Sequence, residues 1–251
     1  MRDLHEYVPM SAVVEYLANN RKRAGDFGYL LGVNTDPKTM KSNKKGQYLT
    51  AIMYMQPGVN MCKWASPGCL AGCLNKAGNP VYAKGKEKAR KARTALFRDE
   101  PVAFLARLVK ELRAFRKKCA KLGVQPAVRL NGTSDIPWER VAGWLFDMFS
   151  DFRFYDYTKG FDRLGKVPAN YWLTFSRSEG NDFEVGLALA RGHHVAVVIA
   201  GKKHKPVAAW RGWETEDGDA DDLLFMRDNP VQVLVPKGPA RKDTSGFVIL
   251  A

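Results

Sequence analysis

Residues 127–157 read AVRLNGTSDIPWERVAGWLFDMFSDFRFYDY and contain the pattern that determines the fold class. The stretch opens with a short apolar segment at 127–130, which is typical of a buried strand. A polar turn leads into 137–149, where apolar residues recur at helical spacing, and a second apolar segment follows at 152–157. A strand, a helix and a strand in this order place two parallel strands in one sheet. The sequence therefore predicts an α/β protein.

The same alternation continues on both sides of this stretch. We expect further strands at 48–55, 171–175, 194–200 and 231–235, and a further helix at 182–191. Together with the central pair, this makes about six strands, most of them separated by a helix or a crossover. The pattern predicts a parallel, six-stranded partial (βα)6 barrel-like core. An open doubly wound sheet is the alternative.

The beginning of the chain differs from this alternating part. Residues 1–46 are expected to form an N-terminal extension, with a short helix at 11–19 and a polar, lysine-rich loop at 34–46. Residues 47–251, which include the cysteine motif described below, are expected to form a single α/β domain. The chain has no apolar run of about eighteen residues, so we expect no membrane span.

Positive charge is concentrated in one part of the chain. The 251 residues carry a net charge of +14, and residues 84–121 alone contain 14 basic and 4 acidic side chains. This region is expected to form a pair of helices, at 81–97 and from 99 to 122, directly after the cysteine motif described next. A basic helical surface is typical of proteins that bind DNA or RNA, and a solvated helix face is the alternative. The nucleic-acid candidates are Lys84, Lys86, Lys88, Arg90, Lys91 and Arg93.

Three cysteines lie close together after the first strand of the predicted core. Cys62, Cys69 and Cys73 have the spacing C-x6-C-x3-C, and glycines between them let the chain turn tightly. Cysteines at such short spacings are typical of iron–sulfur clusters. Three thiolate ligands leave one iron of a [4Fe–4S] cluster open to a small molecule. We therefore predict a [4Fe–4S] cluster on these three cysteines.

Two other interpretations of the cysteines stay open. A structural zinc ion takes four ligands. The candidates for a fourth ligand are Cys119, His193, His194 and His204, all of them distant from the motif in the sequence. Ordinary buried thiols are the third interpretation.

Polar residues follow nearly every predicted strand at the point where the strand ends. In parallel α/β folds the carboxyl ends of the strands meet at one edge, where active sites lie. We expect these residues to surround one site, although any single group can also serve as a turn or a helix cap. The catalytic candidates are Asp156 and Lys159. The candidates for substrate binding are Arg129, Asn131, Ser134, Asp135, Ser176, Arg177, Glu179 and Lys237.

Acidic residues gather in a segment near the C-terminal end, between Glu214 and Asp222. Grouped carboxylates can bind Mg²⁺. We favour the simpler interpretation, in which the segment is a solvated loop that pairs with the basic helices.

Five motifs in a fixed order resemble the "gene product 88" family of bacteriophage proteins, over roughly residues 35 to 250. They are YMQPGVNMCKWASPGCLAGCLN (54–75), RLNGTSDIPWE (129–139), YDYTK (155–159), LTFSRSE (173–179) and KGPARKD (237–243). The resemblance implies a phage origin and expression inside a bacterium, which places the protein in the cytoplasm of the host.

A more distant likeness is to radical S-adenosylmethionine (SAM) enzymes. These enzymes place three cysteines after the first strand of a partial (βα)6 barrel and bind SAM at the open iron. The order of elements is similar here, but the usual spacing is C-x3-C-x2-C, and no glycine-rich second-strand motif is present. Two hypotheses follow. The protein is an enzyme that uses the open iron, with SAM as one candidate cofactor, or it is a non-catalytic nucleic-acid-binding protein whose cluster is structural.

Overall fold

The central stretch folds into two neighbouring parallel strands, as predicted. In the computed structural model, β3 (Gln125–Arg129) pairs in parallel with β4 (Arg153–Thr158). The connection contains two short helices, α6 (Trp138–Val141) and α7 (Trp144–Met148), where the sequence predicts one. The helix breaks at Ala142, whose φ of −150° lies outside the helical region.

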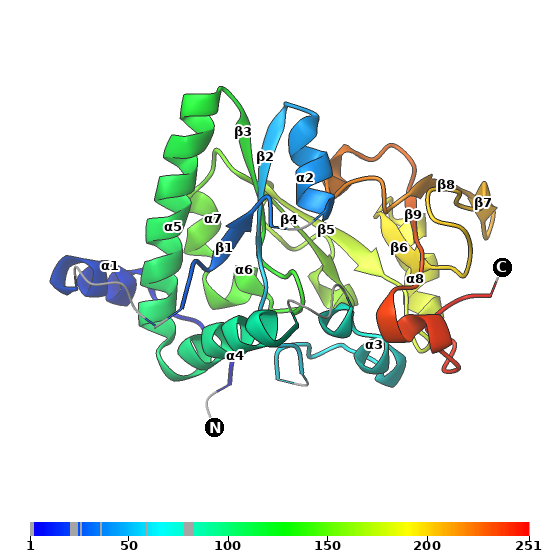
Figure 1. The fold of residues 1–251 in the computed structure, drawn as a ribbon, viewed down its shortest axis with the longest axis horizontal. Coiled ribbons are helices and arrows are strands. Elements are labelled where there is room, and N and C mark those ends of the chain that lie inside the picture. The colour runs from blue at the N-terminus through cyan, green and yellow to red at the C-terminus, as the bar shows by residue number, and fades with distance from the viewer. Residues whose placement is uncertain are drawn as a thin grey trace.

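The structure describes residues 3–20, 25, 27–35, 37–58, 60–77 and 83–250. Within them, the sheet has nine strands in the order β1-β2-β3-β4-β5-β6-β9-β8-β7 (Figure 1). The other strands are β1 (Leu31–Val33), β2 (Tyr48–Met53), β5 (Tyr171–Ser176), β6 (Val195–Val198), β7 (Ala209–Trp210), β8 (Trp213–Asp217) and β9 (Val231–Leu234).

The six predicted strands are neighbours in this sheet and all run parallel, from β2 through β6 to β9. Three strands that the sequence does not predict extend it: β1 is antiparallel to β2, β8 is parallel to β9, and β7 is antiparallel to β8. The α/β class is therefore confirmed, and the predicted number of six strands is too low. The two edge strands, β1 and β7, do not pair with each other, so the described sheet is not a closed barrel.

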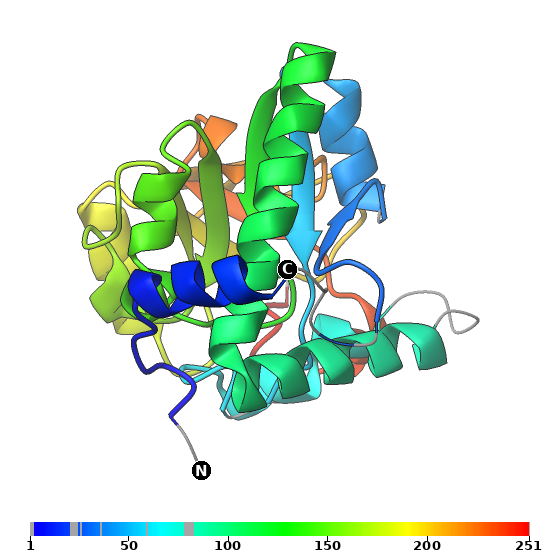
Figure 2. The same ribbon diagram turned by 90° about the vertical axis from the view of Figure 1, so that its left-hand side faces the viewer.

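Helices flank the sheet and gather at one of its ends. The remaining helices are α1 (Met10–Asn19), α2 (Pro37–Lys44), α3 (Pro67–Ala71), α4 (Ala83–Asp99), α5 (Pro101–Leu122) and α8 (Asp182–Ala190), and the 3-10 turns are η1 (Leu74–Lys76), η3 (Phe161–Arg163), η4 (Leu224–Met226) and η5 (Gly238–Lys242). In Figure 1, α5 and α2 lie on opposite sides of β2. In Figure 2, the arrowhead of β2 points toward α3 and α4, so these helices lie at the carboxyl end of the strand.

The predicted helical pair and its end are confirmed. Helix α5 begins at Pro101, and Gly123 ends it with a positive φ of 67°, a conformation that glycine adopts without strain. The predicted loop at 34–46 is wrong, because α2 occupies most of it. Residues 1–46, expected as an extension, contribute β1 to the sheet and bury Leu4, Val8 and Val13 in the main core.

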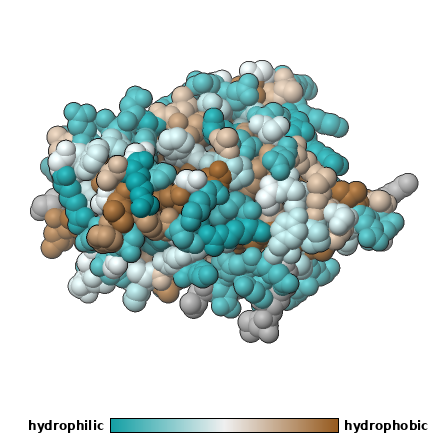
Figure 3. All heavy atoms as spheres, turned by 180° about the vertical axis from the view of Figure 1, so that it is seen from behind, coloured by the Kyte–Doolittle hydropathy of each residue, from teal (hydrophilic) through white to brown (hydrophobic). Residues whose placement is uncertain are grey.

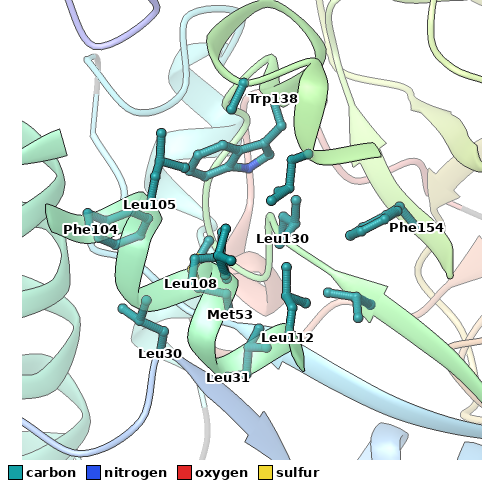
Figure 4. Close-up of a cluster of buried hydrophobic side chains, with 14 of the residues drawn as sticks. Leu30, Leu31, Met53, Phe104, Leu105, Leu108, Leu112, Leu130, Trp138 and Phe154 are labelled. Carbon is teal, nitrogen blue, oxygen red and sulfur yellow. The ribbon is translucent and has the colours of Figure 1, made fainter. Parts of the chain in front are cut away.

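The main core lies between α5 and one face of the sheet. Leu105, Leu108 and Leu112 of α5 project toward Met53 and neighbouring apolar side chains of the sheet (Figure 4). The spacing of three and four residues places these leucines on one side of the helix. Trp138, from α6, closes the top of this cluster in the same view.

The outer surface is largely polar. Seen from behind the view of Figure 1, most of the molecule is teal or white, with smaller brown areas between (Figure 3). No helix among the described residues is long and apolar enough to cross a membrane.

Substituting Leu108→Ala should destabilise the protein by about 2–5 kcal/mol, because it leaves a cavity in the main core. Leu108 is fully buried, whereas Leu122 at the end of the same helix is 56% exposed. Leu122→Ala is therefore the matched control, with an expected cost of at most about 0.5 kcal/mol. Urea unfolding followed by circular dichroism measures both values, and equal costs would contradict this description of the core.

Candidate functional site

A cavity of about 770 Å³ opens at the carboxyl ends of the parallel strands. Each of the six strands lines it with at least one residue, and these include Ile52, Arg129, Tyr157, Ser176, Ala196 and Leu234. Side chains alternate between the two faces of a strand. Their sequence neighbours, such as Val128 and Val233, pack in the apolar clusters of the opposite face. One face of the sheet therefore forms core, and the other lines the cavity.

All three motif cysteines line this cavity. Cys62 lies in the loop after β2, Cys69 belongs to α3, and Cys73 follows α3 directly. Each is a half-buried free thiol. Burial raises the pKa of the Cys62 thiol to about 11, and burial also raises the pKa of Cys73. The charges of Cys69 and Cys73 both act on Cys62, which indicates that the three thiols share one electrostatic environment.

Glu179 holds the cysteine loop in place. Its carboxylate accepts hydrogen bonds from the Ser66 hydroxyl and from the Gly68 amide, each at 2.7 Å. Ser66 is the N-cap of α3 and accepts from the Cys69 amide at 3.2 Å. Burial opposes ionisation of Glu179, but these two hydrogen bonds lower its pKa below the ordinary value. Glu179 does not line the cavity. The structure therefore places this substrate-binding candidate as a support for the cysteine loop.

Gly68 is required by close packing at the same point. A Cβ atom there would lie 2.2 Å from the Ser245 hydroxyl and 2.7 Å from the Cβ of Phe247. Arg177 donates hydrogen bonds to the carbonyls of Gly246 and Phe247, and forms an ion pair with Asp182 at 3.0 Å. The C-terminal segment is thus fixed against α3 by Arg177, which also lines the cavity.

Asp135 connects the cysteine loop to the loops after β3 and β4. Its amide donates to the carbonyl of Met61 at 2.9 Å, beside an isolated bridge between Cys62 and Asp135. Its carboxylate accepts from the Lys159 amide at 2.8 Å and from Arg163 Nη1 at 2.7 Å. Burial raises the pKa of Asp135, and the charge of Arg163 opposes this effect.

Asn131 organises the loop after β3. Its side-chain oxygen accepts from the Ser134 hydroxyl at 2.8 Å and from the Ile136 amide at 2.9 Å. Neither Ser134 nor Asp135 caps the following helix, because α6 begins after Pro137 without a side-chain cap. Asn131, Ser134 and Asp135 all line the cavity.

Asp156 lies outside the cavity lining and is fully buried. It accepts hydrogen bonds from the Asn131 amide at 2.8 Å and from the Tyr171 hydroxyl at 2.7 Å. Burial raises its pKa to about 7, although Arg129 opposes the shift. Of the two catalytic candidates, only Lys159 lines the cavity. Asp156 lies behind Asn131 and accepts a hydrogen bond from the Asn131 side chain, which it thereby positions.

The second half of the acidic segment is buried, so the expectation of a solvated loop paired with the basic helices is wrong for these residues. Asp219, Asp221 and Asp222 are at most 2% exposed. They form ion pairs with side chains of the N-terminal segment and of other loops and strands. These pairs are Asp219 with Lys38 and Lys237, Asp221 with Lys45 and Arg227, and Asp222 with Arg129 and Lys38. Lys237, a predicted binding residue, lines the cavity, and its ion pair with Asp219 holds it there.

Helix α4 divides the six nucleic-acid candidates between two faces. Lys86, Arg90 and Arg93 have i, i+4, i+7 spacing, share one face and line the cavity. Lys84, Lys88 and Lys91 have the same spacing two residues earlier, which places them about 200° around the helix. These three side chains are exposed. Lys91 forms an ion pair with Glu87 at 2.7 Å.

The arginines of the inner face are anchored by neutral oxygens. Arg90 donates to the side-chain oxygen of Asn75 at 2.5 Å and lies 5.1 Å from the ring centroid of Tyr54. Arg93 donates to the backbone carbonyls of Tyr29 and Tyr54. Burial lowers the pKa of both guanidinium groups.

The candidates for a fourth metal ligand lie away from the three thiols. Cys119 is buried in α5, and neither Cys119 nor His193, His194 or His204 is among the residues that line the cavity. Within the described ranges, no three His, Cys, Asp or Glu side chains are grouped closely enough to hold a single metal ion. The described lining therefore offers three sulfur ligands. It does not offer the four ligands that a structural zinc ion takes.

Several residues of the site were missed in the sequence. Lys38, Lys41, Tyr54 and Lys203 line the cavity, and Arg163 lies behind it as a fully buried cation. Arg163 follows Lys159 in the loop after β4, so the strand-end pattern signals it weakly. Nothing in the sequence signals Lys38 or Lys41, because their positions depend on the folding of α2 against the distant acidic segment.

A sequence model described as gene product 88 matches residues 29–251. The match covers most of the chain, so the protein belongs to the gene product 88 family, and the resemblance of its five motifs is confirmed. No curated protein and no solved structure matches the chain, so the more distant likeness to radical SAM enzymes has no support from these comparisons.

Substituting Asp156→Asn should change the pH dependence of stability. The pKa of Asp156 is raised by burial to about 7, so between about pH 4 and pH 7 the folded state binds more protons than the unfolded state. The wild type should therefore lose stability relative to the variant as pH rises, by up to about 1.4 kcal/mol per pH unit. Urea unfolding at several pH values measures this difference. Asp147→Asn, at an exposed carboxylate of α7, is the control, and parallel curves for wild type and Asp156→Asn would contradict the prediction.

Proposed function

We propose that this protein carries a [4Fe–4S] cluster on Cys62, Cys69 and Cys73, with one iron facing the cavity. The observation that supports the proposal is that three free thiols of one loop line one cavity, without a fourth cysteine or a histidine among its described lining residues. In such a cluster each thiolate binds a different iron. The three sulfur atoms therefore need not converge as closely as ligands of a single ion do.

The remaining residues of the site suit this role. Glu179 and Ser66 hold α3 in place. Asp135 forms an isolated bridge with Cys62 and holds that part of the cysteine loop. Lys159 lies near Cys73, and its charge favours the thiolate form that a metal ligand requires. A bound cluster would supply redox or Lewis-acid chemistry at the open iron. The polar groups of Arg129, Ser176 and neighbouring lining residues would bind and orient the substrate.

We also propose that the six parallel strands form a partial (βα)6 barrel with the cavity at its mouth. Each of these strands contributes a lining residue near its carboxyl end, which is the arrangement of barrel enzymes. This layout makes an enzyme the favoured form of the proposal, with SAM as one candidate cofactor at the open iron. The test is anaerobic reduction with dithionite followed by SAM addition. A change in the electron paramagnetic resonance spectrum would support SAM binding, and an unchanged spectrum of the reduced cluster would exclude it.

Single substitutions of the motif cysteines should remove the cluster. Cys62→Ser, Cys69→Ser and Cys73→Ser should each lose most of the iron and sulfide, together with the absorbance near 400 nm that is usual for such clusters. Cys119→Ala should keep both, because Cys119 lies in the core of α5. Iron, sulfide and zinc are measured per chain after anaerobic purification. Zinc without iron or sulfide in the wild type would overturn the proposal.

A second candidate function rests on the exposed lysines of α4. Lys84, Lys88 and Lys91 present three positive charges on one face, which suits the phosphate backbone of DNA or RNA. In this case the protein is a non-catalytic nucleic-acid-binding protein and its cluster is structural.

Replacing these three lysines with glutamine should weaken nucleic-acid binding and flatten its salt dependence. The slope of log K against log salt should fall by about 0.7–0.9 for each phosphate group that the variant no longer neutralises. Fluorescence anisotropy with a labelled oligonucleotide at several salt concentrations measures the slope. Binding by the wild type that does not change with salt would count against this function.

A further inference from the structure

The cavity is strongly cationic. Ten lysine and arginine side chains are among its described lining residues, against two carboxylates, Asp135 and Asp219. The three motif thiolates, if all were ionised, would add at most three negative charges, and the excess of positive charge would remain. Uncompensated charge in a partly enclosed site is unfavourable, so such a lining favours a bound anion.

Some of these cations already have carboxylate partners. Asp219 pairs with Lys38 and Lys237, and Asp222, just behind the lining, pairs with Arg129 at 3.2 Å. These pairs lie on the side of the cavity formed by the acidic segment. On the side of the cysteine loop, Arg177 pairs with Asp182, whereas two other cations are bound differently.

Two cations beside Cys73 form no ion pair with a carboxylate of the described residues. The Arg90 guanidinium donates to the two oxygens of Asn75, which are neutral, and interacts electrostatically with Cys73. The half-buried Lys159 also interacts with Cys73, and its ammonium lies 5.6 Å from the ring centroid of Phe247. In the part of the chain that the structure describes, the Lys159 ammonium forms neither a hydrogen bond nor an ion pair with a carboxylate. Arg90 and Lys159 come from separate elements, α4 and the loop after β4, and both lie near this one thiol.

Two buried polar atoms of the cavity wall also lack a hydrogen bond to the described residues, although the Nε of Arg129 lies 3.9 Å from a carboxylate oxygen of Asp156. The Nε of Arg129 and the hydroxyl of Tyr157 form no hydrogen bond within the described residues, although both atoms are buried. Buried polar groups in folded proteins are nearly always hydrogen-bonded to protein, water or ligand. Both residues line the cavity. Two polar groups in the wall of the cavity are therefore left without a hydrogen bond from the described residues.

We propose that the cavity binds a small phosphorylated ligand, with a phosphate group beside Cys73 between Arg90 and Lys159. This inference rests on the proposed function, because it names the ligand class for the same site. A phosphate group carries about two negative charges at neutral pH, whereas a carboxylate carries one, so phosphate matches the excess of cations better. The guanidinium group of an arginine can donate two parallel hydrogen bonds to phosphate oxygens, and the ammonium group of a lysine adds a compact positive charge.

The size and direction of the site favour a small molecule over a nucleic-acid chain. A volume of about 770 Å³ is within the range of pockets that enclose small ligands and cofactors. The inner face of α4 points into this cavity, whereas a polymer would contact the outer face with Lys84, Lys88 and Lys91.

The test uses inorganic pyrophosphate as the probe and the full-length protein as purified. Isothermal titration calorimetry should show saturable binding, and Lys159→Gln should weaken it about tenfold or more, as expected for loss of a charged hydrogen bond. Lys166→Gln, at an exposed lysine of the same connection between β4 and β5, is the matched control and should bind like the wild type. Succinate, a dicarboxylate, should bind at least tenfold more weakly than pyrophosphate.

Each remaining outcome decides the proposal. Absence of pyrophosphate binding, equal binding by Lys159→Gln, or tighter binding of succinate would overturn it. The proposal would also be overturned if an oligonucleotide bound more tightly than pyrophosphate and if Lys159→Gln did not change the affinity for the oligonucleotide. The variant with all three motif cysteines replaced by serine separates this inference from the proposed cluster. In the wild type, pyrophosphate binding without iron would refute the cluster alone, and iron without pyrophosphate binding would refute the phosphate site alone.

Discussion

The ion pair between Asp135 and Arg163 is the interaction on which the architecture of the site depends. Arg163 is fully buried and also forms an ion pair with Glu139 at 2.9 Å. Removing one partner from a buried ion pair leaves a charge without compensation, which is strongly destabilising. The Asp135 backbone amide also binds the cysteine loop, and its carboxylate accepts from the Lys159 amide, so this one residue connects three strand-end loops. The positions of Cys62 and Lys159 therefore depend on a cation that does not itself line the cavity.

The alternation of side chains along the parallel strands separates stability from function. Residues such as Val128 and Phe154 face the apolar core under α5, and their neighbours face the opposite side. On that side the strands present Arg129 and Tyr157, which would be costly in a core unless their polar atoms were satisfied. A shift of one residue in the register of a strand would exchange the two sets. The main core therefore fixes the orientation of the cavity wall as well as the stability of the fold.

The parts of the structure that follow from local pattern were predictable, and the parts that depend on long-range ion pairs were not. The six neighbouring parallel strands, the helical pair after the cysteines and the placement of most strand-end residues around one cavity follow from periodicity and from the geometry of parallel sheets. Helix α2 was expected to be a loop, because Pro37–Lys44 is mostly polar and lacks an apolar stripe. It is instead held by contacts such as Lys38 to the Gly218 carbonyl, 180 residues away. The same contacts bury Asp219, Asp221 and Asp222, which local sequence alone presents as a solvated segment.

The net charge of the chain acquires a more specific meaning from helix α4. Counted along the sequence, its basic residues form one cluster, but the helical repeat divides the six between Lys84 and Arg93 into an inner and an outer row that differ by about 200°. The inner row borders the thiols and faces a partly enclosed volume, where the effective dielectric is lower than at the surface and charge interactions are stronger. The outer row faces water, where salt screens the same charges. Equal numbers of basic side chains therefore contribute unequally, and the inner row would dominate the proposed recognition of an anion inside the cavity.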